Sequence, residues 1–184
     1  GFLANNVLGQ YDPLLLDDGD HELYFLHPNI VSIADALDVE LDRFRRWIAF
    51  HEIAHAAEFG TAPWLSGHLE RRMEGAVSEL AAGRFDRNAL AELNATMTAV
   101  EGYAELVMDR AFDREYADLR AKLDDRRRNV GPVSRFVRRL LGFGMKRRQY
   151  ERGKTFFDAV ADARGVSGAA AVWEAPENLP SDEE

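Results

Sequence analysis

The chain has 184 residues, 46% of them apolar, and a formal net charge of −9. This length and composition suffice for one domain with its own hydrophobic core, and a second full domain is not expected. Cysteine is absent, which excludes a disulfide framework and thiolate ligands, so any bound metal must be held by His, Asp or Glu. Neither a signal peptide nor a run of about 18 apolar residues is visible, so we expect a cytoplasmic protein without a transmembrane segment.

Two strands are the first predicted elements, over residues 7–16 and 21–27, with the turn-forming sequence DDGD between them. The run Tyr24-Phe25-Leu26 is typical of a strand core. These features predict an N-terminal β-hairpin. Pro28 then favours the start of a helix, and a short helix is predicted over residues 29–37.

A longer helix is predicted next, beginning after Asp38, which is placed to cap its N-terminus. Glu40 and Asp42 lie in its first turn, where acidic side chains interact favourably with the helix dipole. The helix is expected to end near Phe59, because Gly60 is placed to terminate it.

His51, Glu52 and His55 form an HExxH motif within this helix. Histidines four residues apart lie on one helix face, about one turn (~5.4 Å) apart, so both imidazoles can reach one zinc ion. Glu52 can hold the water that zinc activates without being a ligand itself. The apolar residues of the helix form a stripe of Leu41, Phe44, Trp47, Ile48 and Phe59. Steps of three and four residues along this stripe also reach both histidines and Glu58. We therefore favour a zinc site over two core histidines that only form hydrogen bonds.

A break at residues 62–65 precedes a third predicted helix that runs to about Ala82, and Gly83 and Asp86 separate it from a fourth over roughly residues 88–112. Glu101 and Glu105 lie one turn apart on the apolar stripe of the fourth helix, which comprises Met97, Val100, Ala104, Met108 and Ala111. Burying an unpaired carboxylate is costly, so these two acids need partners. A metal ion with its ligating histidines would provide them.

A catalytic zinc site needs a third protein ligand beyond the two histidines. The candidates are Glu58, His68, Glu74, Glu79, Glu101, Glu105 and Asp109. We choose Glu101, because it lies on a buried stripe and Gly102 beside it permits close helix approach. Glu58 and the acids on exposed faces are expected to be solvated.

Glu105 is expected to be an outer carboxylate, one that accepts an N–H from a ligating histidine, His51 or His55, without touching the metal itself. The alternatives are that Glu101 and Glu105 exchange these roles, or that both pair with arginines such as Arg110 or Arg114. Tyr103 and Tyr150 are candidates to donate a hydrogen bond to an oxyanion, and structural roles explain them equally well.

The C-terminal third is predicted to contain a polar helix over residues 114–128, a break at Gly131-Pro132, a basic amphipathic helix over 135–141 and a helix over about 144–163. The end, APENLPSDEE, is expected to be extended. Residues 126–152 carry ten Lys or Arg and one acid, a net charge of +9. Because the whole chain has a net charge of −9, the rest of the chain has a net charge of about −18. Such a segment can bind nucleic acid or anionic lipid. We favour neutralisation by acids of the same chain and expect no specific nucleic-acid partner.

Six blocks spread over nearly the whole chain resemble a family of zincin-like metallopeptidases: VLGQYDP, PNI, FRRWIAFHEIAHAAEFGTAPWL, TAVEGYAELVMD, RRLLGFGMKRRQYERGKTFF and AVWEAPENLP. Members of that family are described as hydrolases or as proteins associated with deazaflavin-coenzyme biosynthesis. The resemblance implies a gluzincin-like mechanism with Zn²⁺ on His51, His55 and Glu101 and with Glu52 as general base. Family members are usually longer at the N-terminus and between the PWL and EGYAE blocks, so this chain resembles a compact or trimmed version.

The sequence therefore predicts a single zincin-like domain of the α+β class, mainly α-helical, whose N-terminal hairpin edges the cleft and offers backbone groups to an extended peptide. The predicted function is zinc-dependent hydrolysis of a peptide or protein substrate. A second hypothesis is a zinc-binding structural or assembly protein without peptidase activity. A third is a basic module that binds nucleic acid or membranes.

Overall fold

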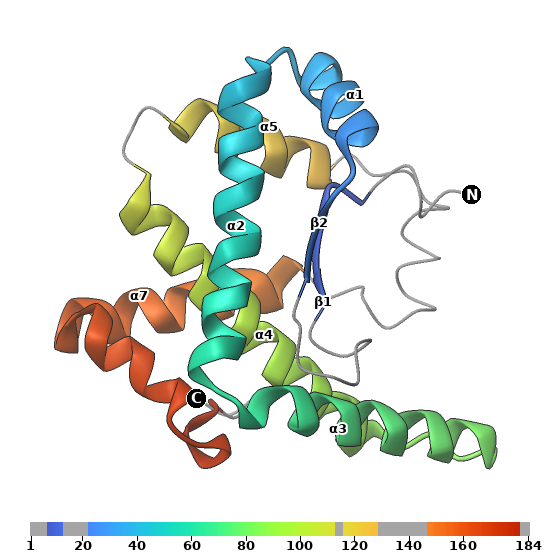
Figure 1. The fold of residues 1–184 in the computed structure, drawn as a ribbon. Coiled ribbons are helices and arrows are strands. Elements are labelled where there is room, and N and C mark those ends of the chain that lie inside the picture. The colour runs from blue at the N-terminus through green and yellow to red at the C-terminus, as the bar shows by residue number, and fades with distance from the viewer. Residues whose placement is uncertain (1–6, 13–21, 113–115, 129–146, 181–184) are drawn as a thin grey trace.

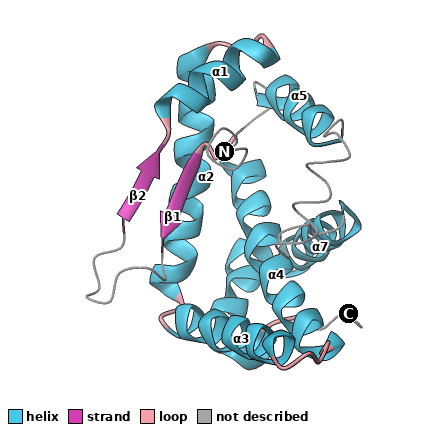
Figure 2. Ribbon diagram, turned by 90° about the vertical axis from the view of Figure 1, so that its right-hand side faces the viewer, coloured by secondary structure: helices cyan, strands magenta, loops and turns pink. Residues whose placement is uncertain are grey.

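The computed structural model describes residues 7–12, 22–112, 116–128 and 147–180 (Figure 1). Strand β1 (Gly9–Asp12) pairs antiparallel with β2 (Glu22–Phe25), with Gly9 opposite Phe25. The predicted hairpin is confirmed with shorter strands, and the residues that connect them lie outside the described ranges. The hairpin runs along one side of the helix that carries HExxH, with β1 in contact with it (Figure 2).

Helix α1 (His27–Leu37) includes Pro28 in its first turn and ends at Asp38, which adopts a left-handed conformation with φ 51° and ψ 58°. The prediction that Asp38 caps the following helix is therefore wrong. Glu40 caps it instead, because its carboxylate oxygens accept hydrogen bonds from the backbone N–H groups of Asp42 at 2.9 Å and Arg43 at 2.6 Å. Aspartate is one of the few residues that tolerate left-handed backbone, which suits it to ending α1.

Helix α2 (Leu41–Thr61) carries the HExxH motif and continues through Gly60, which was expected to end it. The helix stops at Ala62, whose φ of −115° and ψ of 76° lie outside the helical region. Pro63 follows, and a proline disfavours helical backbone in the residue before it. The proline, and not the glycine, therefore marks the end of this helix.

The remaining helices follow the predicted pattern closely in their number and order over the described ranges. Helix α3 (Trp64–Ala81) ends before Gly83, which has a φ of +71°, and α4 (Arg87–Ala111) begins with Asp86 as its N-cap. Helix α5 (Ala117–Arg128) follows, and α7 (Arg147–Ala170) is interrupted at Gly165. The predicted basic helix over 135–141 lies outside the described ranges. No helix in the described parts of the chain has the length and hydropathy needed to cross a membrane.

Two short 3-10 turns, η2 (Ala171–Trp173) and η3 (Pro176–Asn178), follow α7. The prediction of an extended end is wrong at η3, and residues 181–184 lie outside the described ranges. Trp173 is 2% exposed, and its carbonyl oxygen accepts a hydrogen bond from the indole of Trp64 at 3.0 Å. Pro176 lies at the start of η3, where its fixed φ favours a helical turn. A buried aromatic anchor thus folds this segment back onto α3.

Two hydrophobic clusters form the core. One joins the C-terminal part of α2 to α3, α4, α7 and η2, and includes Phe59, Leu65, Val100, Leu106, Phe157 and Trp173. The other joins α1, the N-terminal part of α2 and α5, with Met108 of α4; it includes Ile30, Ile33, Phe44, Trp47, Ile48 and Leu119. The HExxH turn of α2 therefore lies between the segments of that helix that feed the two clusters.

Helix α4 crosses α7 at a close approach between Gly102 and Gly153. A Cβ atom on Gly102 would lie 2.7 Å from the backbone carbonyl carbon of Gly153, nearer than real Cβ atoms come. The position beside Glu101 therefore has no room for a side chain. The close helix approach expected at Gly102 is therefore made with α7, next to the residue that presents Glu101.

Candidate metal centre

Helices α2 and α4 bring His51, His55 and Glu101 together. One donor atom from each of the three lies within 4.8 Å of the other two, and His55 Nε2 is 4.0 Å from Glu101 Oε2. Donors bound to one tetrahedral zinc with bonds of about 2.0–2.2 Å stand roughly 3.4 Å apart, so small side-chain rotations would close the site. Among the described residues, His51, His55 and Glu101 form the group that could hold a metal ion.

The imidazole of His51 is oriented by packing. It stacks on the indole of Trp47, one turn earlier in α2, with ring centroids 5.6 Å apart and planes only 5° from parallel. It also meets the His55 ring edge to face, with ring centroids 4.7 Å apart. Because Trp47 is itself in the core, this stack limits rotation of His51 and directs it toward its helical neighbour.

His55 is oriented by a buried hydrogen bond. Its Nδ1–H donates to Glu58 Oε2 at 2.9 Å, and Glu58 is 2% exposed. With Nδ1 engaged, Nε2 is the nitrogen that faces Glu101. The expectation that Glu58 is solvated is wrong. Glu58 lies seven residues after His51, two helical turns along the same face, which points toward the core.

At His55 the role expected of Glu105 is taken by Glu58, and the expected contact of Glu105 with His51 stays a prediction. The carboxylate of Glu105 is 4% exposed and accepts a hydrogen bond from Arg120 of α5, which also pairs with Asp109. Glu58 occupies the position beside His55 in its place. The alternative in which the acids of α4 pair with arginines thus holds for Glu105, through Arg120 and not through the arginines considered from the sequence.

The other candidate ligands lie elsewhere. His68 packs against Trp64, and its Nε2 is 3.4 Å from Thr96 Oγ1. Glu79 pairs with Arg84 at 2.7 Å, Glu74 is exposed on α3, and Asp109 pairs with Lys154 at 2.8 Å and with Arg120. None of these four joins the group of His51, His55 and Glu101.

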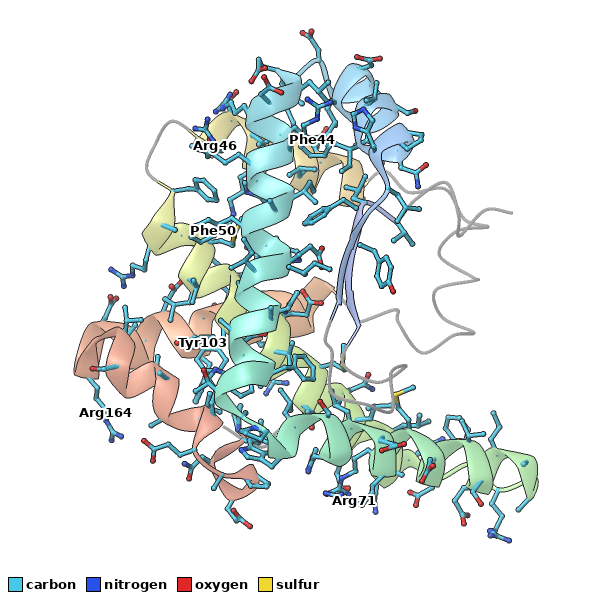
Figure 3. All side chains as sticks on the ribbon, viewed as in Figure 1. Phe44, Arg46, Phe50, Arg71, Tyr103 and Arg164 are labelled. Atoms are coloured by element: carbon cyan, nitrogen blue, oxygen red, sulfur yellow. The ribbon has the colours of Figure 1, made fainter. Side chains whose placement is uncertain are left out.

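Tyr103 lies on the side of α4 that faces α7 (Figure 3). Its ring meets Phe157 and Trp173 edge to face, each at 5.5 Å, so it contributes to the first core cluster. Burial, and then the nearby charge of Glu58, raise the pKa of Tyr103. These contacts favour its structural role. Tyr150 lies in α7, but its side chain is outside the described part of the structure.

Glu52 is 8% exposed and lies about 100° around α2 from His51, on the side toward β1. The strand backbone rests directly on it. A Cβ placed on Gly9 would come within 2.7 Å of Glu52 Cγ and 2.9 Å of Oε1. The sequence identified Glu52 from the motif but gave no indication that β1 covers it.

The carboxylates around His55 create a place for positive charge. Burial alone would lower the pKa of His55, but the hydrogen bond and charge of Glu58, with the charges of Glu101 and Glu52, raise it to about 9. Burial raises the pKa of Glu58 to about 7, against the opposing hydrogen bond and charge of His55. Surroundings that hold a proton on His55 also favour a divalent cation there. Two imidazoles and a carboxylate are, moreover, a donor set that suits zinc.

An arrangement of this kind is typical of zinc-dependent hydrolases. The chain belongs to the zincin-like metallopeptidase family, whose sequence profile matches residues 1–84 and 71–184 and thus the whole chain. The family resemblance and the mainly helical α+β class predicted from the sequence are both confirmed. None of the curated proteins compared matches the chain.

A solved structure supports the same conclusion. The chain is similar to a protein from Chloroflexus aurantiacus described as "a putative hydrolase with a novel fold", with a TM-score of 0.79 and 36% sequence identity. The match covers 100% of this chain and 61% of that one, so this chain spans under two thirds of its relative's length. Neither finding bears on the deazaflavin-coenzyme association, which stays a prediction.

Proposed function

We propose that the protein is a zinc-dependent metallopeptidase in which Glu52 acts as general base. The observation that carries the proposal is the convergence of His51, His55 and Glu101 from two helices, with their donor atoms within 4.8 Å of one another and buried Glu52 beside the first histidine. When bound, zinc supplies Lewis acidity that activates a water and polarises the scissile carbonyl.

The chain's own residues supply the remaining functions. His51, His55 through Nε2, and Glu101 would hold the ion, which gives the three protein ligands that a catalytic zinc site needs. Glu52 accepts a proton from the attacking water and returns it to the leaving amine. Glu58 keeps His55 in the tautomer that presents Nε2.

A peptide substrate is supported by the family and by the position of the hairpin. Strand β1 contacts α2 at Glu52, and an extended peptide can add to the edge of a sheet through backbone hydrogen bonds. A strand beside the general base would therefore align a peptide across the reacting groups.

Glu52→Gln tests the chemistry. The purified wild type should contain about one zinc per chain and cleave members of a peptide library, whereas Glu52→Gln should bind zinc equally and cleave nothing. Full activity in this variant would overturn the mechanism. Zinc binding by a wild type that cleaves no peptide would point instead to a structural or assembly role.

The ligand set is tested by two matched substitutions on α4. Glu101→Gln should weaken zinc binding by at least about 10–100-fold, the loss that even outer carboxylates cause. Glu105→Gln, one turn away on the same helix, should leave zinc affinity near the wild-type value because Glu105 pairs with Arg120. The reverse result would exchange their roles.

A further inference from the structure

Strand β1 passes over Glu52 at Gly9 with no room for a side chain between them. An ideal Cβ built on Gly9 lies 2.7 Å from Glu52 Cγ and 2.9 Å from both Cδ and Oε1. Real Cβ atoms essentially never come within 3.0 Å of another heavy atom of this kind. Any residue other than glycine would therefore force either the strand or the Glu52 side chain to move.

The strand is held in place by contacts that do not involve Glu52. Gly9 is paired with Phe25 of β2, and the carbonyl of Leu8 accepts a hydrogen bond from the N–H of Leu26 at 2.9 Å. One residue earlier, the carbonyl of Val7 accepts from Asn29 Nδ2 at 2.7 Å. Leu8 also packs against the second core cluster. A side chain at position 9 would consequently displace Glu52 more readily than the strand.

Glycine is not required at position 9 for backbone reasons. The glycines with positive φ in the described ranges are Gly83 and Gly165, and Gly9 is not among them. Its strand conformation is open to an L-residue, so a substitution there introduces no backbone strain. The need for glycine is a need for space, and the occupant of that space is the carboxylate end of Glu52.

We propose that Gly9 is a positioning residue for the general base: the bare backbone of β1 sets the conformation in which the Glu52 carboxylate meets the water. This inference rests on the proposed function of Glu52. The contact acts on Glu52 and not on the metal ligands, since His51 is oriented by Trp47 and His55 by Glu58. Substitution of Gly9 should therefore lower the rate of catalysis without weakening metal binding.

Gly9→Ala provides the kinetic test, with Gly60→Ala as its control. Gly60 lies in α2 itself, and a Cβ there meets nothing within 4 Å. Gly9→Ala should lower kcat about 100-fold, the scale of a 1 Å misplacement of a reacting group, with zinc affinity and KM unchanged. Gly60→Ala should match the wild type in all three. A wild-type kcat for Gly9→Ala would overturn the proposal.

A double-mutant cycle in thermal stability tests the contact without using activity. In the native background Gly9→Ala should lower Tm by roughly 2–4 °C, the shift that about 1 kcal/mol gives in a chain of this size, because the new Cβ must displace the buried Glu52 side chain. In a Glu52→Ala background the Cγ and carboxylate are gone, so Gly9→Ala should leave Tm unchanged or raise it. Equal losses of Tm in both backgrounds would assign Gly9 a role in the strand alone and overturn the inference.

The two tests also separate this inference from the proposed function. If the wild type shows no zinc-dependent hydrolysis, the proposed function fails and no positioning role for a general base remains, whatever the Tm cycle shows. If the wild type is active and Glu52→Gln is not, the function stands. Gly9→Ala then decides the positioning role by itself.

Discussion

Replacing Glu58 with glutamine would remove an ionisable carboxylate from the metal centre while preserving the size of the side chain. Glu58 is 2% exposed and accepts the Nδ1–H of His55 at 2.9 Å. Loss of such an outer carboxylate typically costs 10–100-fold in metal affinity, or about 1.4–2.7 kcal/mol at 1.36 kcal/mol per decade. Because this hydrogen bond is buried and poorly screened by salt, we expect a loss near 100-fold.

The assay is zinc competition against a fluorescent chelator at fixed pH and ionic strength. Glu105→Gln is the matched control, because Glu105 is 4% exposed but pairs with Arg120 outside the metal cluster. We expect Glu58→Gln to bind zinc far more weakly than both the wild type and this control. If Glu58→Gln bound zinc within about twofold of the wild type, or if Glu105→Gln lost as much, the role assigned to Glu58 would be refuted.

Two further predictions concern the helix crossing and the pH dependence of zinc binding. Gly102→Ala should lower the free energy of unfolding by about 1–3 kcal/mol, because the new Cβ overpacks against Gly153. The control is Gly75→Ala, whose Cβ meets nothing within 4 Å and which should be neutral or stabilising. Equal urea midpoints for the two variants would contradict the close crossing. Zinc affinity should rise with pH up to about 9, the pKa of His55 without metal, because zinc must displace the imidazole proton below that pH. A titration showing affinity constant between pH 6 and 8 would contradict this.

Much of the fold follows from local signals in the sequence. Pro28 in the first turn of α1 and Asp86 at the N-cap of α4 have unambiguous preferences, and the structure places helices there. Asp38 and Glu40 lie two residues apart, and N-cap propensity favours Asp38, so propensity alone selected the wrong residue. The left-handed conformation of Asp38 accompanies local hydrogen bonds that end α1, from the N–H groups of Asp38 and Val39 to carbonyls of its last turn.

Part of the candidate site could be predicted from the sequence, because helical periodicity determines which residues share a face of a helix. That periodicity put His51, His55 and Glu101 on buried stripes of two helices, which the structure packs together. The same reasoning applied to Glu58 would have predicted its burial, and the His55–Glu58 spacing of three residues signals a side-chain pair on one helix face. Glu58 was expected to be solvated because its side chain is charged, but its position on the helix face decides its burial.

Gly9 could not be assigned from the sequence, because the constraint comes from tertiary contact. Its neighbours indicate only a strand, and Glu52 lies 43 positions further along the chain. Arg120 was missed for a related reason. Helix α5 reads as polar, and only packing against α4 reveals that Arg120 neutralises Glu105 while Leu119 enters the second core cluster.

Anomalous diffraction at the zinc absorption edge, from crystals of the wild type saturated with zinc, tests the central claim most directly. The two-helix metal centre predicts one strong peak, about 2.0–2.2 Å from one ring nitrogen of His51, from Nε2 of His55 and from a carboxylate oxygen of Glu101. A peak that these three residues do not share, or one coordinated by Glu105 in place of Glu101, would contradict it.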